Sequence, residues 1–296
     1  MSDSNRRAET VAIVGGGEMG AAVGRRLRES GARVITTLKG RGAASVARVR
    51  EANLDVVDDD DILVAESALI LSIVPPGEAI VVAERFREPV MRAAMKPFFV
   101  ECNAVSPATV LRIAELLAPT RCGFIDAGII GGPPRPGGAG KGPRFYASGE
   151  HAPQLMKLRN FGLDVAIVDG GIGAASALKM SYAGLTKGLI AVGATMIGAA
   201  SRAGLASALR EELARSQPQL LAMFTAMIPG MYSKAYRWVA EMEQIADFVG
   251  GDETGGTIYL GAARLYEDLA AAFEQSRATA ESIAALDSFC RGETKR

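Results

Sequence analysis

The sequence that decides the fold is VAIVGGGEMGAAVGRRLRE, residues 11–29. It begins with Val11–Val14, an apolar run that is long enough for a buried strand and too short for a helix. Three glycines follow in the pattern G-x-G-x-x-G, and residues 21–29 have the composition of a helix. In such a strand–turn–helix, the glycines allow a tight turn and a close approach of the backbone to a pyrophosphate at the helix N-terminus. The stretch therefore predicts a dinucleotide-binding fold. The residues expected at the cofactor are Gly15, Gly17, Glu18, Met19 and Gly20.

The end of the second expected strand, residues 33–38, bears on which dinucleotide binds. NAD-specific proteins usually have Asp or Glu there, where the carboxylate binds the ribose 2′-hydroxyl. This chain has TTLKGR at residues 36–41, with no carboxylate and two cations. Hydroxyl groups and an arginine suit a 2′-phosphate, so Thr37, Lys39 and Arg41 favour NADP. NAD stays an alternative if the two cations are ordinary surface charges.

Composition narrows the class of protein. The 296 residues suffice for one large or two ordinary domains, and 33 basic residues balance 33 acidic ones. Without a net charge, we expect no nucleic-acid partner. Three scattered cysteines favour a cytoplasmic protein without a zinc site, and no metal is expected. Residues 1–10 lack the apolar core of a signal peptide, and the nearly uncharged stretch Gly188–Ala200 is too short to cross a bilayer. We therefore expect no membrane association.

Short apolar runs alternate with helix-forming segments over roughly the first 125 residues, which predicts a doubly wound, mostly parallel α/β sheet. After Gly170–Gly173 the pattern is helical to residue 288, starting with a long helix over Ala174–Ala200. We therefore expect a Rossmann domain over residues 1–170 and an all-α domain over residues 171–296. The expected strands are residues 11–14, 33–38, 54–57, 68–74, 98–102, 124–130, 144–149 and 164–168.

Two loops are expected to meet a ligand. The strand over residues 68–74 is stopped by two prolines at the carboxyl edge of the sheet, where doubly wound folds bind ligands, so Val74 and Pro75 are assigned to the cofactor. Residues 131–144 form a long Gly- and Pro-rich loop between two strands, which is more often a substrate loop than a spacer. Its cations are Arg135, Lys141 and Arg144.

The side chains available for proton transfer are few. The single histidine, His151, lies in a turn-like segment, and no tyrosine is followed four residues later by lysine. Lys179 and Lys187 lie eight residues apart on one face of the expected long helix. A lysine that acts as a base near neutral pH needs a pKa below its ordinary value of about 10.4. Desolvation, or a second cation nearby such as the other lysine, would supply this, so Lys179 and Lys187 are both candidates for the acid/base.

The glycine fingerprint, the proline-ended strand and the order of segments resemble the β-hydroxyacid dehydrogenases related to 6-phosphogluconate dehydrogenase. In that family a turn G-x-G-x-x-x-x-x-K opens the interdomain helix and carries the acid/base lysine. Residues 171–179, GIGAASALK, match it, so the resemblance implies this role for Lys179. The family's Asp-x-Ser-Thr-x-x-Pro segment is matched by residues 101–107 and its Ala-Pro-Val-Ser-Gly-Gly segment by residues 127–132. The resemblance thereby implies Asn103 as catalytic and Ile130, Gly131 and Gly132 as substrate residues.

The chain departs from the family pattern at several of these positions. Ala183 stands where the family has asparagine one turn after the lysine, and Ile130 replaces the serine of the substrate segment. The usual Lys-Asp pair of the C-terminal domain is missing from residues 235–243. This set resembles a side branch whose C-terminal helical domain is uncharacterised. Tyr182 is a candidate replacement hydroxyl donor, with core packing as the alternative. Arg237 is a candidate anchor for an anionic substrate, with a surface or interface arginine as the alternative.

The sequence therefore predicts an NADP-dependent oxidoreductase that transfers hydride between nicotinamide and the hydroxyl carbon of a small β-hydroxy acid or related alcohol. One alternative is an imine or carbonyl reductase on the same scaffold, and another is a non-catalytic cofactor-binding regulatory protein. The low charge of the helical segment Gly188–Ala200 suggests a homodimer. The expected catalytic residues are Lys179, Asn103, Tyr182 and Lys187.

Overall fold

The computed structural model describes residues 10–138, 142–250, 254–275 and 281–293. The chain forms two compact units, Met1–Met180 and Ser181–Arg296. The division between them falls inside helix α7, Ala174–Arg202, whereas the sequence places the domain boundary just before this helix.

The first unit is built on one eight-stranded sheet with the order β3-β2-β1-β4-β5-β6-β7-β8. Neighbouring strands are parallel except for β6 and β7, which pair antiparallel. The strand order reverses beside β1, so the predicted doubly wound, mostly parallel sheet is confirmed. The strands are β1 (Thr10–Val14), β2 (Arg33–Thr36), β3 (Asp55–Val56), β4 (Leu69–Ser72), β5 (Phe98–Glu101), β6 (Gly123–Ile130), β7 (Arg144–Ser148) and β8 (Asp164–Ile167).

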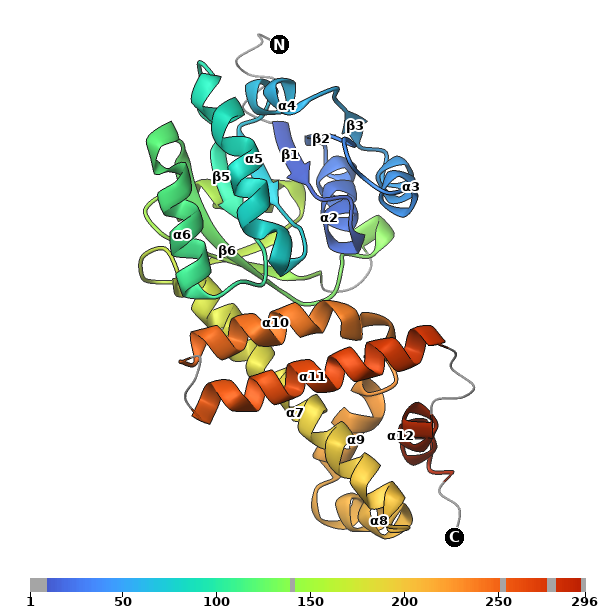
Figure 1. Cartoon of the computed structure of the whole chain (residues 1–296). Coiled ribbons are helices and arrows are strands. Elements are labelled where there is room, and N and C mark those ends of the chain that lie inside the picture. The colour runs from blue at the N-terminus through green and yellow to red at the C-terminus, as the bar shows by residue number, and fades with distance from the viewer. Residues whose placement is uncertain (1–9, 139–141, 251–253, 276–280, 294–296) are drawn as a thin grey trace. The chain divides into compact units, whose positions relative to one another are not determined.

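Helices cover both faces of this sheet. One core lies between the sheet and α2, α3 and η4, and the other between the sheet and α4, α5 and α6, of which α5 and α6 stand in front of the strands in Figure 1. Local signals set the helix starts: Ser106 accepts a hydrogen bond from the Thr109 N–H ahead of α6. The α-helices are α2 (Glu18–Glu29), α3 (Ala43–Glu51), α4 (Asp60–Glu66), α5 (Ala79–Arg92) and α6 (Pro107–Leu117). The 3₁₀ segments are η1 (Pro76–Glu78), η2 (Ala118–Thr120), η3 (Pro136–Gly138) and η4 (Ala152–Phe161).

The second unit is helical throughout its described residues, as predicted. Helices α10 and α11 run side by side (Figure 1), and small residues on α7 let its neighbours approach closely. A Cβ at Gly193 would lie 2.4 Å from the Phe224 ring, and one at Gly184 would lie 2.9 Å from the Tyr259 hydroxyl. Besides the second part of α7, the elements are α8 (Ala206–Ser216), α9 (Pro218–Met227), η5 (Tyr232–Lys234), α10 (Ala235–Phe248), α11 (Thr254–Gln275) and α12 (Glu281–Arg291).

Helix α7 differs from its sequence-based description in one respect. By length and composition alone its 29 residues could cross a membrane, although Gly188–Ala200 by itself is too short. Core helices of globular proteins pass the same test.

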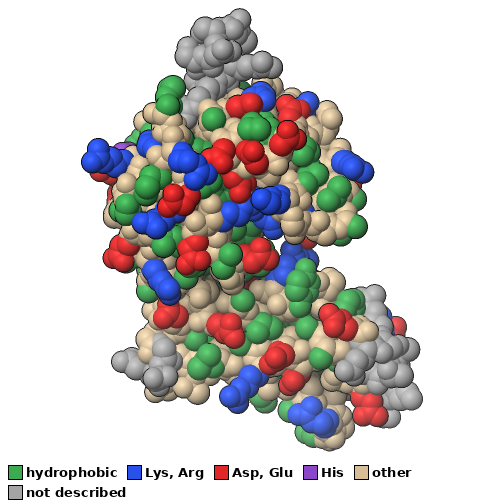
Figure 2. All heavy atoms as spheres, turned by 45° about the horizontal axis from the view of Figure 1, so that its top comes forward, with side chains coloured by type: hydrophobic (Ala, Val, Ile, Leu, Met, Phe, Trp, Pro, Cys, Tyr) green, Lys and Arg blue, Asp and Glu red, His purple; other side chains and the backbone are tan. Residues whose placement is uncertain are grey.

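On the face shown in Figure 2, acidic and basic side chains are intermixed, in keeping with their equal numbers.

Candidate functional site

The glycine-rich turn between β1 and α2 has the geometry of a pyrophosphate site. Gly15 has φ +124°, and a Cβ there would lie 2.0 Å from the Ile73 carbonyl oxygen. A Cβ at Gly20 would lie 2.1 Å from the Gly15 oxygen, so both positions require glycine. At Gly17, by contrast, an added Cβ would meet no atom within 4 Å, and this N-cap residue has no side chain that could cap the N-terminus of α2. The exposed helix end therefore has both the space and the backbone donors that a dinucleotide pyrophosphate needs.

Helix α3 packs on this turn and adds a basic residue that the motif does not reveal. Arg48 Nη1 donates a hydrogen bond to the Gly16 carbonyl oxygen at 3.3 Å, and Ser45 and Val49 lie against Gly16. Arg48 and Val49 lie on the same side of α3 as Ser45, because they follow it by three and four positions. Helical spacing alone could have identified that face, but not that it meets the turn.

The expected adenosine end of the site lies where β2 finishes. Thr37 is buried, Lys39 is exposed, and Arg41 Nη1 lies 3.6 Å from the Glu78 carboxylate on η1. The structure thus places all three predicted residues at the end of β2. It also brings a carboxylate there, since Asp60 at the start of α4 hydrogen-bonds with Thr37.

Asn103 ties together the loops that follow β4 and β5. Its Oδ1 accepts the Val74 N–H at 2.6 Å, and its Nδ2 donates to Ser72 Oγ at 3.0 Å. The side chain is buried, and both ends of its amide are engaged. Asn103 therefore positions Val74 and the exposed Pro75, the two residues predicted to contact the cofactor from β4. This structural role of Asn103 differs from the catalytic role that the family pattern implies.

A buried polar row crosses the carboxyl edge of the sheet. Ser72, Glu101, Asp126 and Ser148 lie opposite one another on β4, β5, β6 and β7. Glu101 Oε1 accepts the Asn103 N–H at 2.9 Å, while Oε2 has no hydrogen-bond partner among the described residues. Desolvation raises the pKa of Glu101 to about 8, and the neighbouring Asp126 adds to the increase. Glu101 is therefore protonated at neutral pH.

Asp126 fixes the first turn of α7 from the neighbouring strand. Its Oδ2 accepts the N–H groups of Gly173 and Ser176 at 2.9 and 3.1 Å, and its Oδ1 accepts Ser176 Oγ at 2.6 Å. Ser148 Oγ donates to Asp126 at 3.0 Å and accepts the Ala175 N–H at 2.9 Å. The carboxylate thus caps a helix that lacks a local capping side chain, which also matches the helix dipole.

This cap sets the position of Lys179, one turn after Ser176. A Cβ at Gly128 would lie 3.0 Å from both Lys179 Cβ and the Ala175 carbonyl oxygen, so glycine favours the close approach of α7 to β6. Lys179 therefore lies beside the strand that leads to Ile130 and Gly131, two of the predicted substrate residues. Gly131 has φ +122°, which favours glycine, and Gly132 is exposed next to it.

Three of the predicted site residues, Lys187, Tyr182 and Arg237, belong to the second unit. Lys187 Nζ forms an ion pair with Glu241 and lies 5.1 Å from the centre of the Trp238 ring. Its charge is thus compensated within that unit, which argues against its being the cation that activates Lys179. Tyr182 is half-exposed on α7, and the Arg237 guanidinium lies 5.7 Å from the Tyr236 ring.

The described part of the loop over residues 131–144 lies along α2. Arg26 Nη2 donates to the Arg135 carbonyl oxygen at 3.2 Å, and the Gly137 N–H lies 3.5 Å from Glu29 Oε1. Arg144 pairs with Asp164 on β8 at 2.7 Å. Arg26 and Glu29 belong to the last turns of α2, away from its phosphate-binding end. Lys141 lies outside the described residues.

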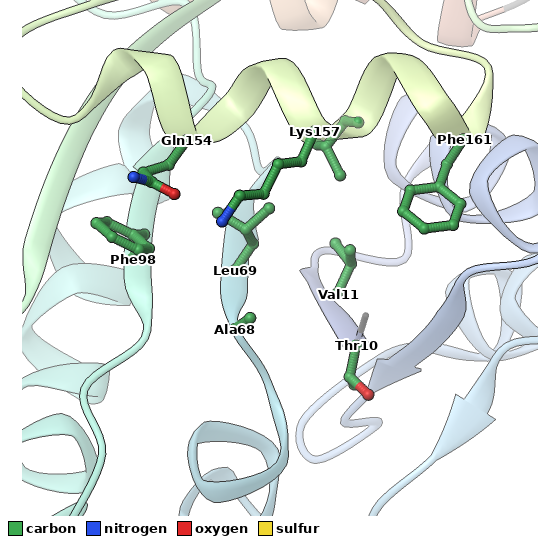
Figure 3. Close-up of a pocket in the computed structure, with 9 residues that line it drawn as sticks. Thr10, Val11, Ala68, Leu69, Phe98, Gln154, Lys157 and Phe161 are labelled. Atoms are coloured by element: carbon green, nitrogen blue, oxygen red, sulfur yellow. The ribbon is translucent and has the colours of Figure 1, made fainter. Parts of the chain in front are cut away.

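A small hollow lies at the opposite edge of the sheet. In Figure 3, Gln154, Lys157 and Phe161 of η4 lie over the first residues of β1, β4 and β5. The hollow measures about 40 Å³, far below the several hundred Å³ of an ordinary ligand site. Doubly wound folds bind ligands at the carboxyl edge, so the glycine-rich turn is the better candidate. Among the described residues, no group of three or more His, Cys, Asp or Glu side chains could hold a metal ion.

Comparison with known proteins agrees with a dinucleotide-binding fold. An uncharacterized 28.5 kDa protein of Methanothermus fervidus is 25% identical over 240 residues, covering 81% of this chain and 90% of that protein. The structure of MTH1747, a conserved protein of unknown function with structural similarity to 3-hydroxyacid dehydrogenases, is 29% identical with a TM-score of 0.66, covering 90% of this chain and 98% of the other. A Mycobacterium tuberculosis 3-hydroxyisobutyrate dehydrogenase shares the fold, with a TM-score of 0.63 at 16% identity and coverages of 97% and 99%.

Family comparison confirms the resemblance that the sequence motifs indicate. Residues 200–269 match a domain of unknown function, DUF1932, in keeping with a side branch whose C-terminal domain is uncharacterised. Residues 10–160, just over half of the chain, match the NAD binding domain of 6-phosphogluconate dehydrogenase. The chain therefore belongs to the family of proteins with a 6-phosphogluconate dehydrogenase-type NAD binding domain.

Proposed function

We propose that this protein is an NADP-dependent oxidoreductase that acts on the hydroxyl carbon of a small, anionic β-hydroxy acid or related alcohol. The observation that carries the proposal is the joint placement of two features in the first unit. A helix that starts at a glycine N-cap, with space for a pyrophosphate, follows β1, and Lys179 is held beside the end of β6 by the Asp126 cap. The likeness in fold to 3-hydroxyacid dehydrogenases supports the same reaction class.

The residues of this chain have distinct roles in such a reaction. A bound nicotinamide cofactor supplies the acceptor or donor of the hydride. The first turn of α2 binds the pyrophosphate, while Asn103 holds the loop at Val74 in place. In oxidation, Lys179 Nζ takes the proton of the substrate hydroxyl, and in reduction its ammonium returns a proton to the carbonyl oxygen. Ile130 and Gly131 line the approach to the substrate, and Arg237 is proposed as an anchor for its anionic group.

Cofactor choice and assembly are part of the proposal. Lys39 and Arg41 at the end of β2 favour the 2′-phosphate of NADP, with NAD as the alternative. A homodimer is supported by a stripe of exposed apolar side chains along α7, which we call the α7 stripe. Its residues are spaced alternately three and four positions apart, as in the seam of a helical interface. Their side chains are 45–67% exposed. The α7 stripe consists of Tyr182, Leu185, Leu189, Val192 and Met196.

Absorbance of the reduced nicotinamide tests the proposal directly. The wild-type protein is assayed with NADP and NAD against a panel of small hydroxy acids and alcohols, and in reverse against the matching carbonyl compounds and imines. We expect turnover of hydroxy acids with NADP. Turnover confined to imines or other carbonyl analogues would favour an imine or carbonyl reductase. Cofactor binding without turnover would favour a regulatory protein.

A further inference from the structure

A carboxylate lies at the end of β2 although that strand carries none. Thr37 directly follows β2, about twenty residues after the glycine-rich turn, where NAD-specific proteins have the Asp or Glu that binds the ribose 2′-hydroxyl. Asp60, the first residue of α4, reaches this position, and its Oδ1 lies 3.3 Å from Thr37 Oγ1. The residues along β2 cannot reveal this side chain, because it comes from another element.

Both oxygens of this carboxylate are engaged by Arg85 on α5. Arg85 Nε donates to Asp60 Oδ2 at 2.6 Å, while Nη2 donates to Asp60 Oδ1 and, at 2.9 Å, to Thr37 Oγ1. The Asp60 and Arg85 side chains are only 15% and 27% exposed. Two-point pairing of a guanidinium with a carboxylate is strong and directional, so the pair presents no net charge beside Thr37.

We propose that Arg85 determines cofactor specificity by neutralising and occupying Asp60. An unpaired carboxylate beside Thr37 would accept a hydrogen bond from the ribose 2′-hydroxyl of NAD. It would repel the 2′-phosphate of NADP. With Arg85 in place, Lys39 and Arg41 bring positive charge to the end of β2, and Glu78 lies 3.6 Å from Arg41. This inference rests on the cofactor site assigned in the proposed function. Arg85 acts on the cofactor alone and needs no contact with the substrate.

Titration calorimetry with NADP and NAD at one fixed salt concentration tests the inference without knowledge of the substrate. The variants are Arg85→Gln, Asp60→Asn and the double substitution, each checked for folding by thermal melting. We expect Arg85→Gln to weaken NADP binding on the order of tenfold or more, because it leaves the Asp60 charge uncompensated, and to leave NAD binding equal or stronger. The double substitution should restore NADP binding, because it removes that charge as well.

A matched control is available on the same two helices. Arg92 on α5 also pairs with a carboxylate on α4, since its Nη2 donates to both oxygens of Asp61 at 2.8 and 2.9 Å, but these side chains are 57% and 54% exposed. Arg92→Gln should leave the ratio of NADP to NAD affinity unchanged. If Arg85→Gln does not fold, Asp60→Asn alone decides, since it releases the positive charge of Arg85 and should strengthen NADP binding.

Three results would overturn the inference. They are an equal loss of both dinucleotides in Arg85→Gln, a double variant that binds NADP no better than Arg85→Gln, and an Asp60→Asn variant whose NADP affinity is unchanged or lower. A wild-type protein that prefers NAD would contradict the NADP preference in the proposed function instead. In that case Arg85→Gln must still shift the affinity ratio further toward NAD for the inference to stand.

Discussion

Gly15 and Gly17 are two residues apart in one motif but differ in what a methyl group would meet. At Gly15 the methyl group would collide with the Ile73 carbonyl oxygen, whereas at Gly17 it would enter open space. We expect Gly17→Ala to keep its stability in urea unfolding and to lose dinucleotide affinity in calorimetry by about tenfold or more, because the methyl group takes the space of the pyrophosphate. Gly15→Ala should lose stability. Gly17→Ala with full affinity would show that the phosphates bind elsewhere.

Glu101 predicts a pH dependence of stability whose sign is opposite to that of an ordinary carboxylate. Burial raises its pKa from the usual 4.5 to about 8, so between these values the folded state keeps a proton that the unfolded state has released. The free energy of unfolding should therefore fall as pH rises from about 5 to about 8, with a slope of up to about 1.4 kcal/mol per pH unit from this group. Above pH 8 its contribution is lost.

Urea unfolding of the wild type and Glu101→Gln at several pH values isolates this contribution. The amide has no proton to release, so the variant should lack the downward slope between pH 5 and 8 and should gain on the wild type as pH rises. Parallel pH profiles of the two proteins would mean that Glu101 titrates normally in the folded state.

The start of α7 depends on a carboxylate from another element. Asp126→Ala removes the acceptor of the Gly173 and Ser176 N–H groups and should cost about 1–3 kcal/mol in urea unfolding. Asp126→Asn should recover most of this loss, because its amide oxygen can take the place of Oδ2. With an active substrate, Asp126→Ala should lower kcat more than it raises KM for the cofactor, since Lys179 loses its fixed position. Equal stability of the wild type and the alanine variant would contradict the cap.

The elements themselves were largely predictable, because each depends on local pattern. The apolar runs predict all eight strands within two residues at each end, and Ser106 with Pro107 marks the start of α6. No sequence pattern indicates the 3₁₀ segment η4, since Pro153 and the mixed composition of the segment give no clear period. Residues that act across elements were missed for a similar reason. Asp60, Arg85 and Arg48 are ordinary charged helix residues until the tertiary fold brings them to the end of β2 and to the glycine-rich turn.

At the scale of the whole molecule, the α7 stripe predicts a homodimer. Val192→Lys places a charge in the middle of the stripe, which a paired apolar interface cannot accommodate, so the variant should elute as a monomer in size-exclusion chromatography with light scattering. Val81→Lys is the control, because Val81 has a similar exposure, 61% against 55% for Val192, but lies on α5. A wild type that is monomeric at micromolar concentration, or a Val192→Lys variant that remains dimeric, would contradict the role of the stripe.

The central claim is that Lys179 transfers the proton in an NADP-dependent oxidation or reduction. The most direct measurement compares kcat and cofactor affinity of the wild type, Lys179→Ala and Lys187→Ala on the best substrate from the nicotinamide assay. We expect Lys179→Ala to lose about 10²–10⁴-fold in kcat with cofactor affinity unchanged, the range typical of general acid–base catalysis. Lys187→Ala should lower the stability of the protein, because it removes the ion pair with Glu241, and should leave kcat of the chemical step largely unchanged. Full turnover by a folded Lys179→Ala variant would contradict the account.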